Sequence, residues 1–295
     1  MNTIMLRRLG LFAAAAGLVT TLAGCSSPDP SGNPNATAAS AVLDSIAVPG
    51  AGASKTLDRI KDKGVLRAGV IAAAPFSLQD PVNSNWYGPA PDVVSALAQK
   101  LDVKVEWVVT DFDTIVAGLQ ADKYDIATTS LYATAERKKV VDFVNYAKAG
   151  ACYVARKDDD RISSLADLNN SDVKVLVVSG SSFVTDFPKK YPEANLSAKP
   201  LPPGAGIFFS EVTSKRFDVT PIESTLAKQV AAQQPDLKIL PDAETCLTNP
   251  DIPQDVGLAV RKGDDEFREL LQATATALQP VTDKSVVKYS SEAGK

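Results

Sequence analysis

The sequence predicts an α/β fold with mostly parallel sheets, and three observations lead to that prediction. From residue 55 onward, short apolar or alternating segments typical of strands follow segments with helical periodicity. This alternating part continues to the end of the 295-residue chain, which is longer than a typical domain of about 100–200 residues. Hydrophobic residues make up 45% of the chain, enough for the core of one large or two medium domains. We therefore expect two lobes.

The expected elements can be placed in order along the chain. Residues 65–70 form an apolar run that predicts a buried strand. Asp92 is expected to cap the next helix, whose apolar residues recur at helical spacing. Further strands are expected at 103–109, 124–128, 173–178, 217–222 and 255–260, and further helices after Asp113, at 224–232 and at 264–278.

Composition and charge exclude several classes of function. The chain carries 31 Lys and Arg against 35 Asp and Glu, a formal net charge of −4, which argues against binding to nucleic acid. It contains no histidine, which rules out a Ser/His/Asp triad, a Cys/His dyad and a His-ligated metal. Its three cysteines lack the spacing of metal ligands. We expect no metal and no cofactor.

The N-terminus has the pattern of an export signal. Two arginines precede an apolar stretch over 9–23, and small residues lead to Cys25. The stretch is shorter than the roughly 20 residues that a bilayer-spanning helix needs. Residues 22–25, Leu-Ala-Gly-Cys, resemble a bacterial lipobox, which implies a lipoprotein signal peptide over 1–24 and lipidation of Cys25. The alternative is a plain signal peptide with an incidental cysteine.

Residues 25–54 predict a flexible tether behind that anchor. They are rich in Ser, Pro, Asn, Ala and Gly and show no apolar periodicity. Such a segment buries too little surface to offset its ordering entropy.

Polar and aromatic side chains follow the predicted strands. In open α/β sheets, ligands bind beyond the carboxyl ends of the strands, so the loops there form the candidate binding site. These loops contain Pro75-Phe76, Phe112, residues 129–137, Gly180-Ser181-Ser182 and Glu223.

Four segments carry a resemblance to a known family. Residues 111–125 end in Lys-Tyr-Asp, and residues 134–143 read Thr-x-Glu-Arg followed by Val-Asp-Phe. Leu-Ala-Asp-Leu at 165–168 and Gly-Leu-Ala-Val-Arg-Lys-Gly-Asp at 257–264 continue the pattern. In this order, across residues 57–278, they resemble bacterial extracellular solute-binding proteins of the polar amino-acid uptake systems, family 3.

The resemblance implies a two-lobed, type II periplasmic-binding-protein-like fold, each lobe a mostly parallel sheet flanked by helices. Two crossing segments join the lobes, with 55–150 and 251–290 in the first lobe and 151–250 in the second. The implied protein is a monomer without catalytic activity, attached to the cell membrane only by the lipid on Cys25. It closes on a small polar solute, an amino acid or related carboxylate, and delivers it to the permease of an ABC importer.

The resemblance also assigns roles to single residues. Arg137 matches the residue that clamps the ligand carboxylate, and a guanidinium offers the rigid fork that a carboxylate fits. Ser130 and the Gly180-Ser181-Ser182 turn match groups that hydrogen-bond the same carboxylate. Glu223 matches the acid, usually Asp, that accepts bonds from the ligand's ammonium group. Phe112 matches an aromatic that stacks on its side chain.

Plainer readings of these residues stay open. Arg137 could be a solvated charge, and Glu223 could only favour the start of the next helix. The other open readings are helix capping by Ser181 and Ser182, core packing by Phe112, and a cleft wall or core position for Phe76.

Three departures from the family pattern bear on the ligand. Residues 88–92, Gly-Pro-Ala-Pro-Asp, lack the family's first aromatic and first acid, and the loop 72–74 lacks an aromatic. Tyr132 stands where a small Ser or Thr is common, and its ring can fill the pocket or its hydroxyl can donate. We see no strong case for lysine or arginine as ligand, and a ligand outside the standard amino acids stays open.

Two cysteines lie near the implied lobe crossings. Cys152 and Cys246 fall close to segments that run side by side in this fold, and export permits oxidation. We expect a disulfide, with two buried free thiols as the alternative.

Two other functions share this scaffold. Prephenate- and arogenate-type dehydratases resemble these binding proteins, and a Glu at the position of Glu223 can act there as a general acid if its pKa is raised. A sensor subunit that presents ligand to a membrane receptor would use the same site.

Overall fold

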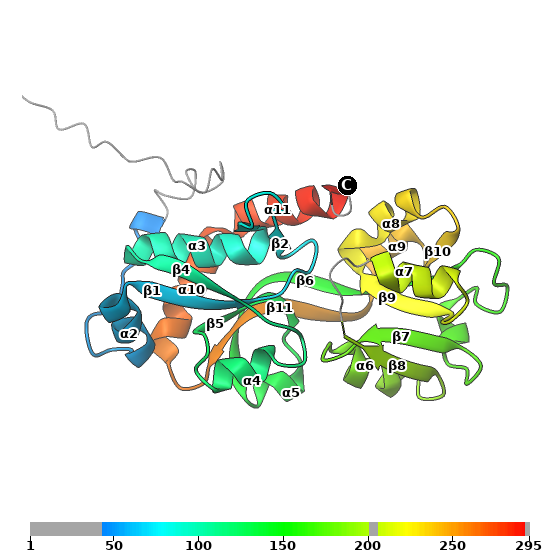
Figure 1. Cartoon of the computed structure of the whole chain (residues 1–295), viewed down its shortest axis with the longest axis horizontal. Helices are drawn as coiled ribbons and strands as arrows, with labels where there is room; N and C mark the ends of the chain where they lie inside the picture. The colour runs from blue at the N-terminus through cyan, green and yellow to red at the C-terminus, as the bar shows by residue number, and fades with distance from the viewer. Residues whose placement is uncertain (1–42, 201–205, 293–295) are drawn as a thin grey trace, which may run out of the picture. The chain divides into compact units, whose positions relative to one another are not determined.

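The computed structural model describes residues 43–200 and 206–292 (Figure 1). Within these residues, one nine-stranded sheet carries the fold and a small hairpin stands apart. The sheet order is β4 (Lys104–Val109), β1 (Val65–Val70), β5 (Ile126–Tyr132), β11 (Asp251–Arg261), β6 (Val141–Arg156), β9 (Val219–Glu223), β7 (Lys174–Val178) and β8 (Asn195–Lys199), with β10 (Leu237–Leu240) paired to β6. This confirms the α/β class.

We call one part of the sheet the first lobe: β1, β4 and β5 with helices α3 (Pro89–Leu101), α4 (Ile115–Gln120) and α10 (Asp265–Ala277). β1 lies between β4 and β5 and pairs in parallel with both. The apolar residues of α3 recur every three or four positions, so Val93 and Leu97 are fully buried in a core that α10 also joins. Ile115 of α4 packs into a different cluster with Tyr124. Helices therefore cover both faces.

The second lobe contains β7 to β10 with helices α6 (Phe183–Lys190), α7 (Gly206–Thr213), α8 (Ala227–Gln233) and α9 (Ala243–Thr248). β7 pairs in parallel with β8 and β9. Phe187 of α6 lies in the cluster that continues into the first lobe, whereas Val212 of α7 and Val230 of α8 pack with Cys152. This lobe too has helices on both faces of its strands, as Figure 1 shows.

Two long antiparallel strands connect the lobes. β6 has 16 residues; its first part pairs with β11, and its last part pairs with β9 and β10. Ala151 lies at the change of partner, opposite Asp251 of β11 and Glu223 of β9. The strand was not expected from the sequence, because its two halves have different partners and no single alternation runs through it.

Several expected element boundaries need correction. α3 begins at Pro89 after Gly88, so Asp92 lies inside the first turn and does not cap it. Asp113 does not cap α4 either; Thr114 holds that position, and Asp111 accepts hydrogen bonds from its N–H and hydroxyl at 2.8 Å. The expected helix at 264–278 is confirmed as α10, with the Asp264 carboxylate accepting from the backbone of the first turn.

The end of the expected tether is part of the fold. Leu43 is only 4% exposed and packs in the main core, and Lys100 Nζ donates to the carbonyl of Asp44. Ser54 caps α2 (Lys55–Lys63) by accepting from Leu57 N–H, and its hydroxyl donates to Asp264. The prediction of a flexible tether is therefore wrong for 43–54; residues 25–42 and the signal segment lie outside the described residues.

Cys152 and Cys246 are joined by a disulfide bond with a Cα–Cα distance of 5.8 Å. Both are fully buried. The bond connects β6 to α9, beside the crossing, inside the apolar cluster of the second lobe.

The remaining elements were not expected from the sequence. They are β2 (Leu78–Gln79), β3 (Trp86–Tyr87), α5 (Ala135–Lys138), η1 (Leu165–Leu168) and α11 (Gln279–Glu292), besides α2, α6, α7, α9, β8 and β10. The helix expected at 224–232 is present as η2 (Ser224–Leu226) followed by α8. In the described part of the chain, no helix combines the length and apolarity needed to cross a bilayer.

Candidate ligand-binding site

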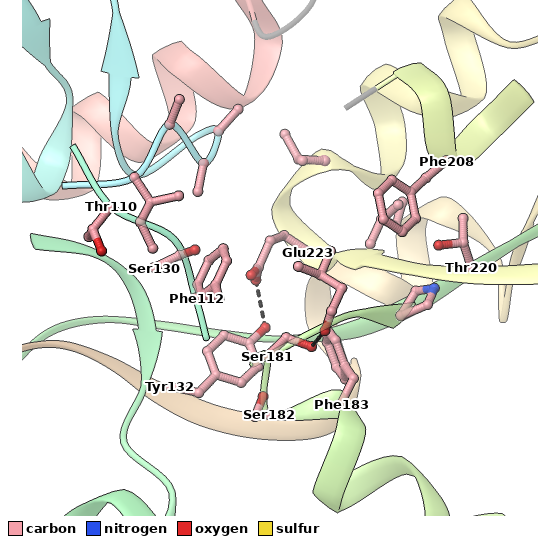
Figure 2. A pocket seen from close by; sticks show the side chains of 18 of the residues that line it. Thr110, Phe112, Ser130, Tyr132, Ser181, Ser182, Phe183, Phe208, Thr220 and Glu223 are labelled. Atoms are coloured by element: carbon pink, nitrogen blue, oxygen red, sulfur yellow. Dashed lines mark hydrogen bonds between the residues drawn. The ribbon is translucent and has the colours of Figure 1, made fainter. Parts of the chain in front are cut away.

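A cavity of about 400 Å³ lies where the carboxyl ends of strands from both lobes meet. Figure 2 shows its side chains converging from loops that are distant in sequence. Its described lining is Ile71, Ala72, Ala73, Ala74, Gln79, Trp86, Val109, Thr110, Phe112, Ser130, Tyr132 and Arg137 from the first lobe, and Val178, Ser181, Ser182, Phe183, Phe208, Phe209, Thr220, Pro221, Ile222, Glu223 and Leu226 from the second.

Arg137 reaches this cavity from helix α5. Thr134 caps the helix by accepting from the N–H of Arg137, which orients the side chain toward the second lobe. Its two terminal nitrogens donate to the carbonyls of Tyr132 and Gly180 at 2.9 and 2.8 Å. Burial lowers the pKa of the guanidinium to about 10, and the charge of Asp186 acts in the opposite direction. The group stays charged at neutral pH, with further N–H donors for a ligand.

Glu223 enters the cavity from the end of β9. The Tyr132 hydroxyl donates to Glu223 Oε2 at 2.6 Å, a length typical of a hydroxyl bound to an ionised carboxylate (Figure 2). Burial raises the pKa of Glu223 to about 7, and the Tyr132 hydrogen bond opposes that shift. Burial, and then the charge of Glu223, hold the pKa of Tyr132 well above its usual value. Both forms of the Glu223 carboxyl are therefore populated near neutrality.

The lobes touch directly at Gly180. A Cβ built on Gly180 would lie 2.4 Å from the backbone of Phe112 and Asp113, and its φ of +70° is also unfavourable for other residues. Next to it, the Ser179 hydroxyl donates to the Asp113 carboxylate at 2.6 Å. With the Arg137 bond to the Gly180 carbonyl, these contacts close one edge of the cavity.

The predicted serines lie at the cavity, and the structure specifies their bonds. The hydroxyl of Ser181 donates to the Val178 carbonyl at 2.6 Å. Ser182 occupies the position before α6, but its side chain makes no capping bond. Ser130 lines the cavity from β5 and is 7% exposed.

One predicted ligand residue is not at the cavity. Phe76 is fully buried, does not line the cavity, and packs edge-on against Tyr146 with ring centroids 6.0 Å apart. Phe76 follows Pro75 in a loop at a strand end. An apolar residue is expected there whether it packs in the core or lines the cleft, so the sequence could not separate the two.

Aromatic residues that were not predicted form much of the wall. They are Trp86, Phe183, Phe208 and Phe209. Phe183 packs edge-on against Tyr132 with ring centroids 5.9 Å apart. Phe183 directly follows the Gly-Ser-Ser turn, and that position could have indicated its place at the cavity. Trp86, Phe208 and Phe209 belong to elements that the sequence did not indicate.

The arrangement defines a class of protein. A half-buried guanidinium from one α/β lobe and a carboxylate from the other share one cavity, as in a receptor that encloses a small ligand between two lobes. Within the described residues, no group of three or more His, Cys, Asp or Glu side chains is arranged to hold a metal ion.

The family model of bacterial extracellular solute-binding proteins, family 3, matches residues 66–284, and the chain belongs to this family. The match confirms the resemblance inferred from the sequence motifs.

Individual relatives agree with this assignment. The "Probable amino-acid-binding protein YxeM" of Bacillus subtilis is 30% identical over 47% of this chain, which spans about half (52%) of that protein. The L-arginine-binding protein of Pseudomonas aeruginosa is 29% identical over 74% of this chain and 83% of its own. A crystal structure of the ancestral amino acid-binding protein AncCDT-1, a precursor of cyclohexadienyl dehydratase, is similar with a TM-score of 0.68, 33% identity, and coverage of 80% and 99% of the two chains.

Proposed function

We propose that this protein captures a small amino acid by closure of its two lobes and delivers it to an ABC importer. The observation that carries the proposal is the presence of Arg137 and Glu223, one from each lobe, in the same cavity. A guanidinium and a carboxylate complement the two ends of a zwitterion. A ligand that bridges both lobes binds the closed form more tightly than the open form and therefore shifts the population toward it.

The expected export address supports this role. The family is extracellular by description, and the segment Leu-Ala-Gly-Cys at 22–25 would attach the mature chain to the membrane through Cys25. In this proposal the lipid is the protein's only membrane contact and the permease its only protein partner. The protein itself acts as a monomer and catalyses no reaction.

A thermal-shift screen tests the proposal, because a ligand that binds only the folded state stabilises it by mass action. The purified mature chain is heated with each standard amino acid in turn. We expect at least one of them to raise the midpoint of unfolding, and to do so much less in Arg137→Ala. The proposal fails if none does, or if the same ligand stabilises Arg137→Ala equally well.

One observation favours a second candidate, a dehydratase on the same scaffold. The pKa of Glu223, about 7, would allow this carboxyl to donate a proton to a leaving hydroxyl while Arg137 holds the substrate carboxylate. Incubation with prephenate or arogenate, followed by detection of an aromatic product, separates the two functions. We expect no product; a product that disappears in Glu223→Gln would establish the enzyme.

A further inference from the structure

The described cavity lining contains one cationic and one anionic side chain, Arg137 and Glu223. The other lining residues are apolar, aromatic or uncharged polar. Figure 2 shows Phe112 and Phe208 on opposite sides of Glu223. An amino acid that binds Arg137 through its carboxylate and Glu223 through its ammonium group occupies both charged side chains of the cavity. Its side chain then meets walls that offer no further carboxylate among the described residues.

Asp111 and Asp113, which flank the lining residue Phe112, are engaged elsewhere. Asp111 accepts from the backbone and the hydroxyl of Thr114. Asp113 accepts from the hydroxyl of Ser179. Asp92 lies in the first turn of α3 and is not among the lining residues. None of these carboxylates is among the described residues that line the cavity.

Tyr132 limits Glu223 further. Its hydroxyl already donates to one carboxylate oxygen and so occupies one of the acceptor positions that a ligand's ammonium could use. The Tyr132 ring is 2% exposed and packs against Phe183, so it is held in place as a fixed wall. A second cationic group on the ligand would have to compete for the same carboxylate.

We infer that the ligand is an amino acid with an uncharged, apolar side chain, aromatic or branched, and that arginine and lysine are excluded. This inference rests on the proposed function. A guanidinium or ammonium side chain that is desolvated without a carboxylate partner loses its hydration, and contact with the aromatic walls compensates only part of that loss. An apolar side chain gains instead, because Phe112, Phe208, Phe209 and Leu226 offer it a surface away from water.

Titration calorimetry on the purified mature chain tests the inference with phenylalanine, leucine, arginine and lysine. We expect phenylalanine or leucine to bind at least about a hundredfold more tightly than arginine or lysine. Equal or tighter binding of arginine or lysine overturns the inference and leaves the proposed function in place. Absence of binding by every standard amino acid overturns the proposed function, and the inference with it.

An isosteric variant tests the cause. Gln79 lines the cavity with an exposed side chain, and Gln79→Glu adds a carboxylate there without changing the volume of the residue. We expect the affinity ratio of arginine to phenylalanine to rise by about threefold to tenfold. Gln99→Glu, an equal charge change on the exposed side of α3, is the matched control and should leave the ratio unchanged. If Gln79→Glu and Gln99→Glu show the same ratio of arginine to phenylalanine affinity, a missing carboxylate does not set the preference for apolar side chains.

Discussion

Arg156 and Arg137 are two enclosed arginines with opposite surroundings. Arg156, 7% exposed in β6, donates to the carboxylates of Asp159 and Asp218 and to two backbone carbonyls. The side chain of Arg137 instead donates to the backbone carbonyls of Tyr132 and Gly180. Arg161 supplies a second cation to both aspartates of the Arg156 cluster.

The same contrast holds for the acids. The hydrogen bond from Arg161 is the largest cause that lowers the pKa of Asp159. Burial instead raises the pKa of Glu223, which accepts a hydrogen bond from the phenol of Tyr132. The charges of the Arg156 cluster are neutralised by other side chains of the protein. Arg137 and Glu223 have no such partner in the described cavity lining and can be neutralised by a ligand. This contrast identifies the site independently of any motif.

The largest effect on ligand affinity is expected for Arg137→Ala. This substitution removes the group proposed to bind the ligand carboxylate and breaks no structural ion pair among the described residues. The affinity should fall by about 2–5 kcal/mol, which is roughly thirtyfold to several thousandfold. The free energy of unfolding without ligand should change by less than about 1 kcal/mol. Calorimetry and urea denaturation measure the two quantities. Arg137→Lys should also bind weakly, because an ammonium lacks the planar fork.

Arg156→Ala should have the opposite profile. Removal of its guanidinium leaves Asp159 and Asp218 enclosed with Arg161 alone, so the free energy of unfolding should fall by about 3 kcal/mol. Ligand affinity at a temperature where the variant is folded should be nearly unchanged, because the cluster does not line the cavity. If Arg156→Ala weakens binding as much as Arg137→Ala does, the contrast between the two arginines does not hold.

Gly180→Ala tests the direct contact between the lobes. Its new methyl group would meet the backbone of Phe112 and Asp113, which destabilises the closed form by about 1–3 kcal/mol and weakens ligand binding correspondingly. Gly263→Ala is the matched control, since Gly263 also has positive φ, +83°, but nothing within 4 Å of a Cβ. Both variants carry the backbone strain, so only the first should lose affinity. Equal affinities would show that the contact at Gly180 is absent from the liganded form.

A change of pH should alter both stability and ligand affinity. The pKa of Glu223, about 7 in the folded protein, lies above the value of about 4.3 for an unfolded chain. Its contribution to stability is therefore complete below pH 4.3 and disappears as the pH rises through 7. Glu223→Gln should remove this part of the slope in denaturation measured across the same pH range. Amino-acid affinity of the unsubstituted protein should rise over that range, because the ionised acid is the form that pairs with an ammonium.

The sequence predicted those parts of the molecule that depend on short segments. The strand at 65–70, the helix capped by Asp264 and the loop positions of Arg137 and Glu223 each follow from a local pattern or from the rule that ligands bind beyond strand ends. Phe76 shows the limit, since an apolar residue beside such a loop can face either the core or the cavity.

Other features depend on tertiary partners that the sequence does not indicate. The 16-residue β6 changes partners midway, and its pattern reflects two environments. Residues 43–54 have the composition of a linker, yet Leu43 is buried against residues far along the chain. Phe208 and Phe209 line the cavity from a helix for which no local signal was found.

The place where β6 changes partners has a mechanical consequence for the proposed closure. Ala151 is the residue at which β6 passes from Asp251 to Glu223, so the acid of the site is paired with the strand that connects the two lobes. If the proposed closure turns the lobes about this connection, a group next to it moves less than a group farther away. Glu223 would then offer the ligand's cationic end a nearly stationary acceptor.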